Sequence, residues 1–331
     1  MSAAAPELPG PLLAEVSRSF SLTLRVLPKA VRFQIGLAYL LARTSDTIAD
    51  TTLIPPAQRV ESLRQFRACI LGTRTDAMDF AGLAAGQSTP SEKILLQRTP
   101  ETLALLTALS PDDLKLVREV LDTITRGQEL DLERFGNGDR LVALANAADL
   151  DAYTFAVAGC VGEFWTKMTL AHCFTALPCP ASFVEDGVQF GKGLQLVNVL
   201  RDLPRDLRNG RCYLPLDELA QAGLQPEELL AHENWPRLRP VYNTWLAKAQ
   251  AHLSAGARYT LAIPSGQYRL RLACAWPLLM GQETLALLHR ANPLQPEPRL
   301  KISRAQVRGI LWRTIWRLPF RNTWEKLFTQ A

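Results

Sequence analysis

The stretch LAYLLARTSDTIAD, residues 37–50, decides the fold, and QLVNVLRDLPRDL, residues 195–207, repeats its pattern. Each is part of an apolar segment too long for a β-strand, and each carries two aspartates spaced i, i+4 at its polar end. On a helix this spacing places both carboxylates on one face, one turn apart. The sequence therefore predicts two long helices, one bearing Asp46 and Asp50 and the other bearing Asp202 and Asp206.

The same helical period dominates the rest of the chain, over residues 116–135, 183–203 and 268–291. Ser110 followed by Pro111 is typical of a helix N-cap, and Ser182 with Glu185 fits a capping box. Strand-like alternation is nearly absent, and residues 72–100 have the composition of a surface connection containing a short helix. We expect an all-α fold, with a single catalytic domain over residues 1–298 and a tail over residues 299–331.

The aspartate pairs have two possible interpretations. Two such faces across a cavity would concentrate negative charge, which is costly unless cations fill the site. Mg²⁺ suits such a site because it binds a few carboxylates together with substrate phosphates, and Arg43 and Arg201 stand beside the pairs. An isolated pair at this spacing is also common on a solvated helix face, so spacing alone leaves both interpretations open.

Glycines gather in the predicted helices near these motifs. Glycine in a helix interior costs about 1 kcal/mol relative to alanine, so each position needs a reason. Close helix packing and room for a bulky ligand explain them equally well. The residues are Gly159, Gly162, Gly187, Gly191 and Gly193.

Four motifs occur along the chain in a specific order: SRSF (17–20), YLLARTSDTIAD (39–50), YTFAVAGCVG (153–162) and QLVNVLRDLPRDLRNGRCYLP (195–215). Together they resemble the squalene/phytoene synthase family, the head-to-head prenyl transferases, over about residues 15–310. The resemblance implies an isoprenoid synthase fold around a central cavity. It also implies an enzyme that ionises two prenyl diphosphates and joins them.

Residue roles follow from the resemblance where the motifs match. The Mg²⁺ ligands would be Asp46, Asp50, Asp202 and Asp206. The catalytic residues would be Tyr39 and Tyr153, near the reacting carbons, with the arginines Arg43 and Arg201 at the diphosphates. Further substrate contacts would be Ser17, Arg18, Ser19, Phe20, Gln195, Asn198 and Arg211. Glu129 and Asp131 match an acidic helix of the family, with either structural support or direct catalysis as their role.

The segments CAWPLLMGQETLALLHRANP (274–293) and RLKISRAQV (299–307) resemble the C-terminal region of squalene synthases. That resemblance implies NADPH, with Asn198, Lys301 and Arg304 as its contacts, although Ser303 stands where a basic residue is usual. We expect a squalene synthase acting on farnesyl diphosphate with Mg²⁺ and NADPH. The alternatives are a phytoene or dehydrosqualene synthase without reductant, and a non-catalytic assembly protein on the same fold.

The formal charge of +5 is concentrated in the tail, where residues 299–331 contain eight Lys/Arg and one Glu. Basic residues mixed with Trp and Phe are typical of a helix at a membrane surface, although a helix packed on the domain with a solvated basic side explains them as well. Pro319 is expected to end or kink that helix. The first residues lack the pattern of a secretory signal, and no apolar run reaches the roughly 18 residues of a membrane span. We expect a cytoplasmic enzyme with peripheral attachment to the inner membrane surface, and no nucleic-acid partner.

Overall fold

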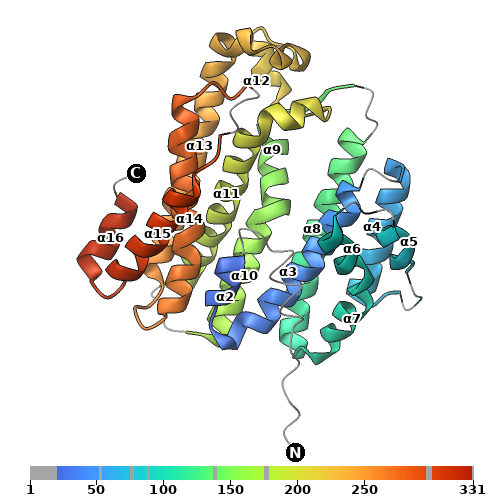
Figure 1. Ribbon diagram of the computed structural model, residues 1–331, viewed down its shortest axis with the longest axis vertical. Coiled ribbons are helices and arrows are strands. Elements are labelled where there is room, and N and C mark those ends of the chain that lie inside the picture. Colours follow the sequence, from blue (N-terminus) through green and yellow to red (C-terminus); the bar gives the residue numbers. More distant parts are fainter. Residues whose placement is uncertain are drawn as a thin grey trace, which may run out of the picture. The chain divides into compact units, whose positions relative to one another are not determined.

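The computed structural model describes residues 21–51, 54–74, 76, 78–85, 87, 89–136, 140–174, 179–295 and 300–329. Helices form nearly all the regular structure of these residues, which confirms the predicted all-α class (Figure 1). The longer helices are α3 (Lys29–Asp50), α4 (Pro56–Leu71), α8 (Pro111–Phe135), α10 (Cys160–His172), α11 (Pro180–Arg208), α13 (Trp235–Ala262) and α14 (Tyr268–Arg290). None of the described helices is long and apolar enough to cross a membrane.

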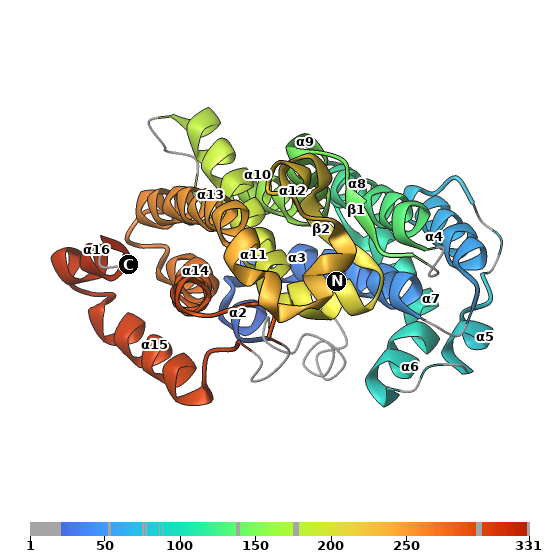
Figure 2. The same ribbon diagram turned by 90° about the horizontal axis from the view of Figure 1, so that it is seen from above.

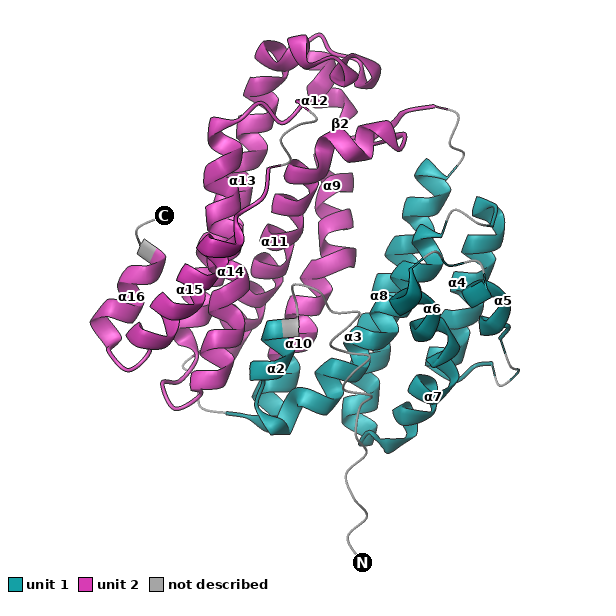
Figure 3. Ribbon diagram, viewed as in Figure 1, with its two compact units in different colours: residues 1–136, 167–175 teal, residues 137–166, 176–331 magenta. Residues whose placement is uncertain are grey.

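The chain forms two compact units (Figure 3). The first comprises Met1–Gly136 and Lys167–Thr175, and the second comprises Asn137–Thr166 and Ala176–Ala331. The helix α10 contributes residues to both units. The predicted division at residue 298 stays a prediction, and the helices that follow it belong to the second unit.

In the first unit, α8 packs against α3 and α4. Ser110 is the N-cap of α8, and its hydroxyl accepts a hydrogen bond from the backbone N–H of Asp113 at 3.2 Å, as predicted. The segment 72–100 is more helical than predicted, because it contains α5 (Phe80–Ala85), α6 (Pro90–Gln97) and the start of α7 (Thr99–Ala104). Prolines in the first turn of α6 and α7 favour these helix starts.

In the second unit, α11 packs against both α13 and α14. It begins at Pro180 with Cys179 as N-cap, so the capping box predicted at Ser182 and Glu185 is wrong. Ser182 lies inside the first turn, and its hydroxyl donates to the Cys179 carbonyl at 3.0 Å. Two shorter helices, α9 (Ala147–Thr154) and α12 (Leu216–Gln221), also lie in this unit.

Glycines allow α11 to approach α10 and the preceding residues 155–159 closely. A Cβ on Gly162 would lie 1.9 Å from the Gly187 carbonyl oxygen, and one on Gly191 would lie 2.1 Å from the carbonyl oxygen of Ala158. Neither position has room for a methyl group. The surroundings of Gly159, Gly187 and Gly193 are similarly tight, which favours the packing explanation of all five glycines over the ligand explanation.

Two irregular features accompany these helices. A π-helical turn, η3 (Phe155–Gly159), joins α9 to α10. The strands β1 (Val142–Leu144) and β2 (Arg211–Pro215) pair in parallel and lie side by side in Figure 2. Their register is Val142 with Arg211, Ala143 with Cys212 and Leu144 with Pro215, so β2 contains a bulge.

The tail forms two helices, α15 (Arg304–Arg317) and α16 (Arg321–Thr329). The break between them spans Pro319, which confirms the predicted helix end. Trp276 of α14 donates from Nε1 to Thr314 Oγ1 at 2.9 Å, and Ile310 is buried. One side of α15 therefore packs on α14.

Candidate active site

The first aspartate pair lies at the C-terminal end of α3, with Asp50 as the last residue of the helix and Asp46 one turn earlier. The free carbonyls of a helix C-terminus carry partial negative charge, and the last turn of α3 contains no basic residue. Two carboxylates at this position are unfavourable by themselves. A bound cation would stabilise both of them.

Neighbouring elements of the same unit hold Asp46 in place. Arg43 Nη1 lies 3.7 Å from Asp46 Oδ2, and Arg43 Nη2 lies 2.7 Å from Glu92 Oε1 in α6. Gln128 of α8 donates from Nε2 to Asp46 Oδ1 at 2.5 Å. The arginine predicted to contact a diphosphate is thus fixed between two carboxylates at the end of α3.

The pKa of the Asp46 carboxyl is raised from 3.8 to about 7, first by desolvation and second by repulsion from Asp50. Arg43 and Gln128 act in the opposite direction. The Asp46 side chain keeps 48% of its surface exposed, and water moderates this rise. The upward direction of the shift indicates a carboxylate pair that lacks sufficient positive charge from the protein.

The donor atoms at the end of α3 fit Mg²⁺. Carboxylate and amide oxygens are the hard ligands that this ion takes, directly or through bound water. Gln128 Oε1 is buried and has no hydrogen-bond partner within the described part of the chain. Buried polar atoms are nearly always hydrogen-bonded, so this carbonyl oxygen is free to accept from a metal-bound water.

Glu129, the next residue of α8, forms ion pairs with a neighbouring helix. Its carboxylate lies 3.5 Å from Arg64 Nε and 3.4 Å from Arg67 Nε, both in α4. These ion pairs join α8 to α4 and support structural stabilisation as the role of Glu129. Asp131 lies on the same helix.

The second aspartate pair lies near the C-terminal end of α11, in the second unit. Arg201 forms a two-point contact with its neighbour Asp202, with Nε to Oδ1 at 3.1 Å and Nη2 to Oδ2 at 2.6 Å. Such bidentate pairs fix the planes of both groups. Arg201 therefore orients the Asp202 carboxylate and places a positive charge beside it.

Pro204 lies between Asp202 and Asp206 inside α11. Proline has no N–H, so the carbonyl of Leu200 loses its normal helical partner. The Tyr242 hydroxyl of α13 donates to that carbonyl at 3.0 Å instead. Tyr242 is fully buried, and this contact keeps the helix intact at the aspartate pair.

Three predicted substrate or catalytic residues come together between α9 and α11. Gln195 donates from Nε2 to the Tyr153 hydroxyl at 3.3 Å, and Asn198 donates from Nδ2 to Gln195 Oε1 at 3.4 Å. The Tyr153 ring also stacks on Tyr213, with centroids 4.4 Å apart and an angle of 26° between planes. The sequence motifs that contain these residues are thus brought into direct contact within one unit.

The structure also gives the location of the remaining predicted site residues. Tyr39 is half-buried on α3, and Arg211 is half-buried on β2. Lys301 and Arg304 are exposed at the start of α15, and Ser303 is its N-cap, with a capping box to Gln306. Ser303 therefore caps α15 at the position where a basic residue is usual. The motif Ser17, Arg18, Ser19 and Phe20 lies outside the described residues.

Sequence reasoning missed Gln128 and Tyr213 as members of these contacts. Gln128 was detectable in principle, because it precedes the acidic residue Glu129 in a recognised motif. Tyr213 follows Arg211 in the last motif, but only the structure reveals that it stacks on Tyr153. No group of three or more His, Cys, Asp and Glu side chains with metal-binding geometry occurs among the described residues.

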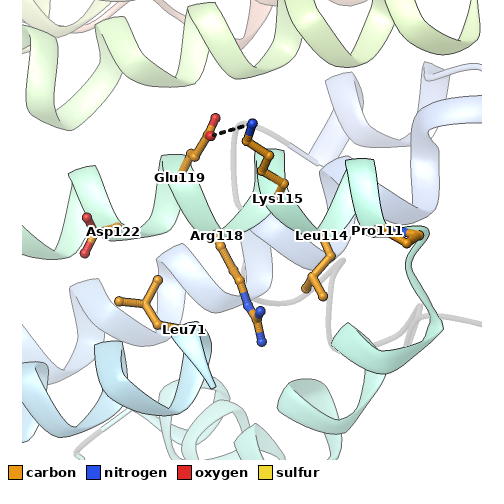
Figure 4. Close-up of a pocket in the computed structure, with 7 residues that line it drawn as sticks. All are labelled: Leu71, Pro111, Leu114, Lys115, Arg118, Glu119 and Asp122. Carbon is orange, nitrogen blue, oxygen red and sulfur yellow. Dashed lines mark ion pairs between the residues drawn. The ribbon is translucent and has the colours of Figure 1, made fainter. Parts of the chain in front are cut away.

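A surface depression of about 470 Å³ lies elsewhere in the first unit, along α8 and the end of α4 (Figure 4). It contains none of the predicted site residues. Figure 4 shows the ion pair between Lys115 and Glu119 at its edge, and the two atoms are 3.9 Å apart. The lining residues are Leu71, Pro111, Leu114, Lys115, Arg118, Glu119 and Asp122.

Comparison with solved structures defines the class of fold. The complex of TcSQS with the ligand BPH1237 superposes with a TM-score of 0.76 at 20% identity, covering 97% of this chain and 95% of that one. The helical architecture and this similarity identify the isoprenoid synthase fold, as predicted.

The family model for squalene/phytoene synthases matches residues 13–306, and the chain belongs to that family. A bifunctional lycopene cyclase/phytoene synthase of Colletotrichum graminicola is 32% identical over 257 residues, which are 76% of this chain and 42% of the relative. The squalene synthase ERG9 of Saccharomyces cerevisiae is 28% identical over 289 residues, which are 84% of this chain and 60% of the relative. The chain spans about half the length of the first curated relatives that it matches.

Proposed function

We propose that this protein is a squalene synthase, a Mg²⁺-dependent prenyl transferase that uses farnesyl diphosphate and NADPH. The observation that carries the transferase part is the aspartate pair at the end of α3, where Asp46 contacts Arg43 and Gln128 and has a raised pKa. A carboxylate pair with a raised pKa is stabilised by a bound cation. Mg²⁺ held by carboxylates in turn binds the phosphates of a substrate. Asp202 and Asp206 form a second carboxylate pair on α11, and Arg201 places a positive charge beside Asp202.

The proposed reaction has two steps. Two farnesyl diphosphates form presqualene diphosphate, with release of pyrophosphate and one proton. Presqualene diphosphate then loses its pyrophosphate and accepts a hydride from NADPH, which gives squalene and NADP⁺. Each aspartate pair would hold Mg²⁺, which would supply positive charge to stabilise a diphosphate leaving group.

The chain's own residues have distinct parts in this proposal. Arg43 and Arg201 supply positive charge beside Asp46 and Asp202, where the leaving groups would be held. Tyr153 offers an aromatic face to a carbocation, and its hydroxyl is held by Gln195. Lys301 and Arg304, exposed beside the capped start of α15, fit the phosphates of NADPH, with Asn198 as a further contact.

The test of this proposal is the product profile from farnesyl diphosphate with Mg²⁺, with and without NADPH, by gas chromatography and mass spectrometry. Squalene that depends on NADPH is expected. Dehydrosqualene in both reactions would contradict the reductive step but leave the transferase intact. Absence of any product from farnesyl or geranylgeranyl diphosphate would contradict the transferase itself and favour a non-catalytic assembly role.

A second candidate is a phytoene-type synthase that needs no reductant. It is favoured by the 32% identity to the Colletotrichum graminicola lycopene cyclase/phytoene synthase, against 28% to the yeast squalene synthase. Supplying geranylgeranyl diphosphate distinguishes the two, because only this candidate predicts a forty-carbon product as the main one.

We also propose that the protein is cytoplasmic and attaches to the inner membrane surface through its tail. The exposed apolar side chains Trp312, Ile315, Trp316 and Phe320 stand among the arginines of α15 and α16. Exposed Trp and Phe with interspersed Arg suit the interface of an anionic bilayer. Such attachment would place an enzyme with a very apolar product beside the phase that dissolves it.

A further inference from the structure

Tyr213 lies in the bulge of β2. Val142 pairs with Arg211 and Ala143 with Cys212, but the next residue, Leu144, pairs with Pro215. Tyr213 and Leu214 are therefore the extra residues of β2 at this point. Bulges change the direction of a side chain, and they are frequent beside active sites.

The side chain of Tyr213 rests on Tyr153. The ring centroids are 4.4 Å apart with 26° between planes, and Tyr213 is only 5% exposed. Stacking at this distance stabilises the pair beyond the effect of the apolar area that it buries. Tyr153 is thus held at its face by Tyr213 and at its hydroxyl by Gln195, 3.3 Å away.

The strand that carries Tyr213 is firmly fixed. Cys212 and Leu214 on either side are fully buried. The turn before the strand uses Gly210 at φ +76°, and the Gly210 carbonyl accepts from the Val142 N–H at 3.0 Å. A rigid strand is needed if Tyr213 is to define the position of another ring. By contrast, Tyr153 lies at the end of α9, next to the π-helical turn.

We propose that Tyr213 is a positioning residue, which acts by holding the Tyr153 ring in the orientation needed for the reaction. This inference rests on the proposed function, because it requires Tyr153 to contact the reacting carbons. Arg211, a predicted diphosphate contact, lies two residues earlier on the same strand. β2 therefore links the position of the ring to the diphosphate end of the substrate.

The experiment compares single-turnover rates, kcat and KM of the full chain with Tyr213→Leu, Tyr213→Met and Tyr213→Phe. Leu and Met remove the ring, and Met fills more of the space if Leu alone impairs folding. Phe keeps the ring. We expect Tyr213→Leu and Tyr213→Met to lower kcat by about tenfold to 100-fold with little change in KM, because a small misplacement of a reacting group has effects of this size. Tyr213→Phe should restore the rate.

The matched control is a second buried stack in the same unit. Phe183 and Tyr259 lie 4.1 Å apart with 7° between planes, and Phe183 is 4% exposed. Phe183→Leu should lower the melting temperature about as much as Tyr213→Leu but leave kcat unchanged. Equal losses of kcat in both variants, or full activity of folded Tyr213→Met, would overturn the inference. Inactivity of the unmodified protein would instead contradict the proposed function.

Discussion

Asp46 lies where three physical effects act on one carboxylate. The end of α3 presents free carbonyls to it, Asp50 adds a second negative charge, and desolvation penalises its ionised form. A protein without need of a cation gains nothing from this arrangement. Arg43 and Gln128 also hold the side chain in position, so the carboxylate is preorganised for a ligand.

Replacement of single aspartates should separate catalysis from folding. Asp46→Asn or Asp202→Asn is expected to lower turnover by at least about 100-fold, since each removes charge that would hold the leaving group's cation. Helix content by circular dichroism should stay the same. Asp186→Asn is the control, because Asp186 lies on α11 but pairs with Arg258. A loss in the control equal to that of Asp202→Asn would count against specific roles for the aspartates.

Gln128 should affect the metal without contacting the substrate. Gln128→Ala removes the hydrogen bond to Asp46 and the buried carbonyl oxygen that we assign to a metal-bound water. We expect Mg²⁺ affinity to fall by about tenfold, a usual size for the loss of a group that orients a ligand. Titration calorimetry with Mg²⁺ in the absence of substrate measures this directly. Gln65→Ala serves as the control, because Gln65 of α4 donates to Glu61 and not to an aspartate of the pair. Unchanged affinity in Gln128→Ala would contradict the assignment.

At the scale of secondary-structure elements, the contact between α10 and α11 depends on missing side chains. Gly162→Ala would bring a Cβ to 1.9 Å from the Gly187 carbonyl oxygen, so the helices would have to move apart. We expect a loss of about 1–3 kcal/mol in the free energy of unfolding, measured by urea denaturation. Gly309→Ala in α15 is the matched control, since its added Cβ has no described atom within 4 Å apart from its chain neighbours and the backbone of its own helix. That variant should be neutral or stabilised by up to about 1 kcal/mol.

A partly buried charge cluster contributed by α9, α11 and α13 predicts acid sensitivity. Lys192 Nζ lies 2.6 Å from Asp151 Oδ1, and Lys248 Nζ lies 3.7 Å from the same oxygen. Desolvation and the two lysines lower the pKa of His252 from 6.5 to about 4, while Asp151 and Glu185 act in the opposite direction.

The sign of the pH effect follows from these values. Between pH 6.5 and 4 the unfolded chain binds a proton at His252 that the folded chain does not, so stability falls as the pH is lowered through this range. His252→Gln should reduce the loss of melting temperature between pH 7 and pH 5. The control is His289→Gln, at an exposed histidine. The same pH dependence in His252→Gln and in the unmodified protein would show that other groups determine it.

At the scale of the whole molecule, the tail is the part that we expect to meet a membrane. Trp312 and Trp316 are 63% and 68% exposed, among the largest exposed apolar side chains of the described residues. Trp312→Ser/Trp316→Ser is expected to reduce sedimentation with anionic phospholipid vesicles several-fold and to leave turnover in detergent unchanged. Leu130→Ser, an exposed apolar residue of α8, should bind like the unmodified protein. Equal vesicle binding by all three proteins would exclude the tail as the attachment site.

The sequence predicted best those features that depend on residues close together in the chain, such as helical period and spacing. The long helices α3, α8, α11 and α14, the cap at Ser110 and the helix break at Pro319 all follow from such local rules. The bulge in β2 and the contact between Tyr153 and Tyr213 depend on residues distant along the chain, which no local rule reports. The start of α11 was misplaced because Pro180 at the first helical position took precedence over the Ser182 pattern.

The π-helical turn between α9 and α10 has a consequence for how this chain tolerates length changes. A π-turn holds one more residue than an α-turn, so deleting one residue from Phe155–Gly159 would restore a regular helix. The helices on either side would keep their phase, because the π-turn holds its surplus residue within one closed turn. Deleting one residue from the regular part of α10 would instead rotate everything before it by about 100° relative to the rest of the helix, because each residue of an α-helix turns by that angle. Tyr153 would then leave both Tyr213 and Gln195, although no residue of the site had been replaced. The π-helical turn is therefore a place where the chain can lose a residue while Tyr153 keeps its partners.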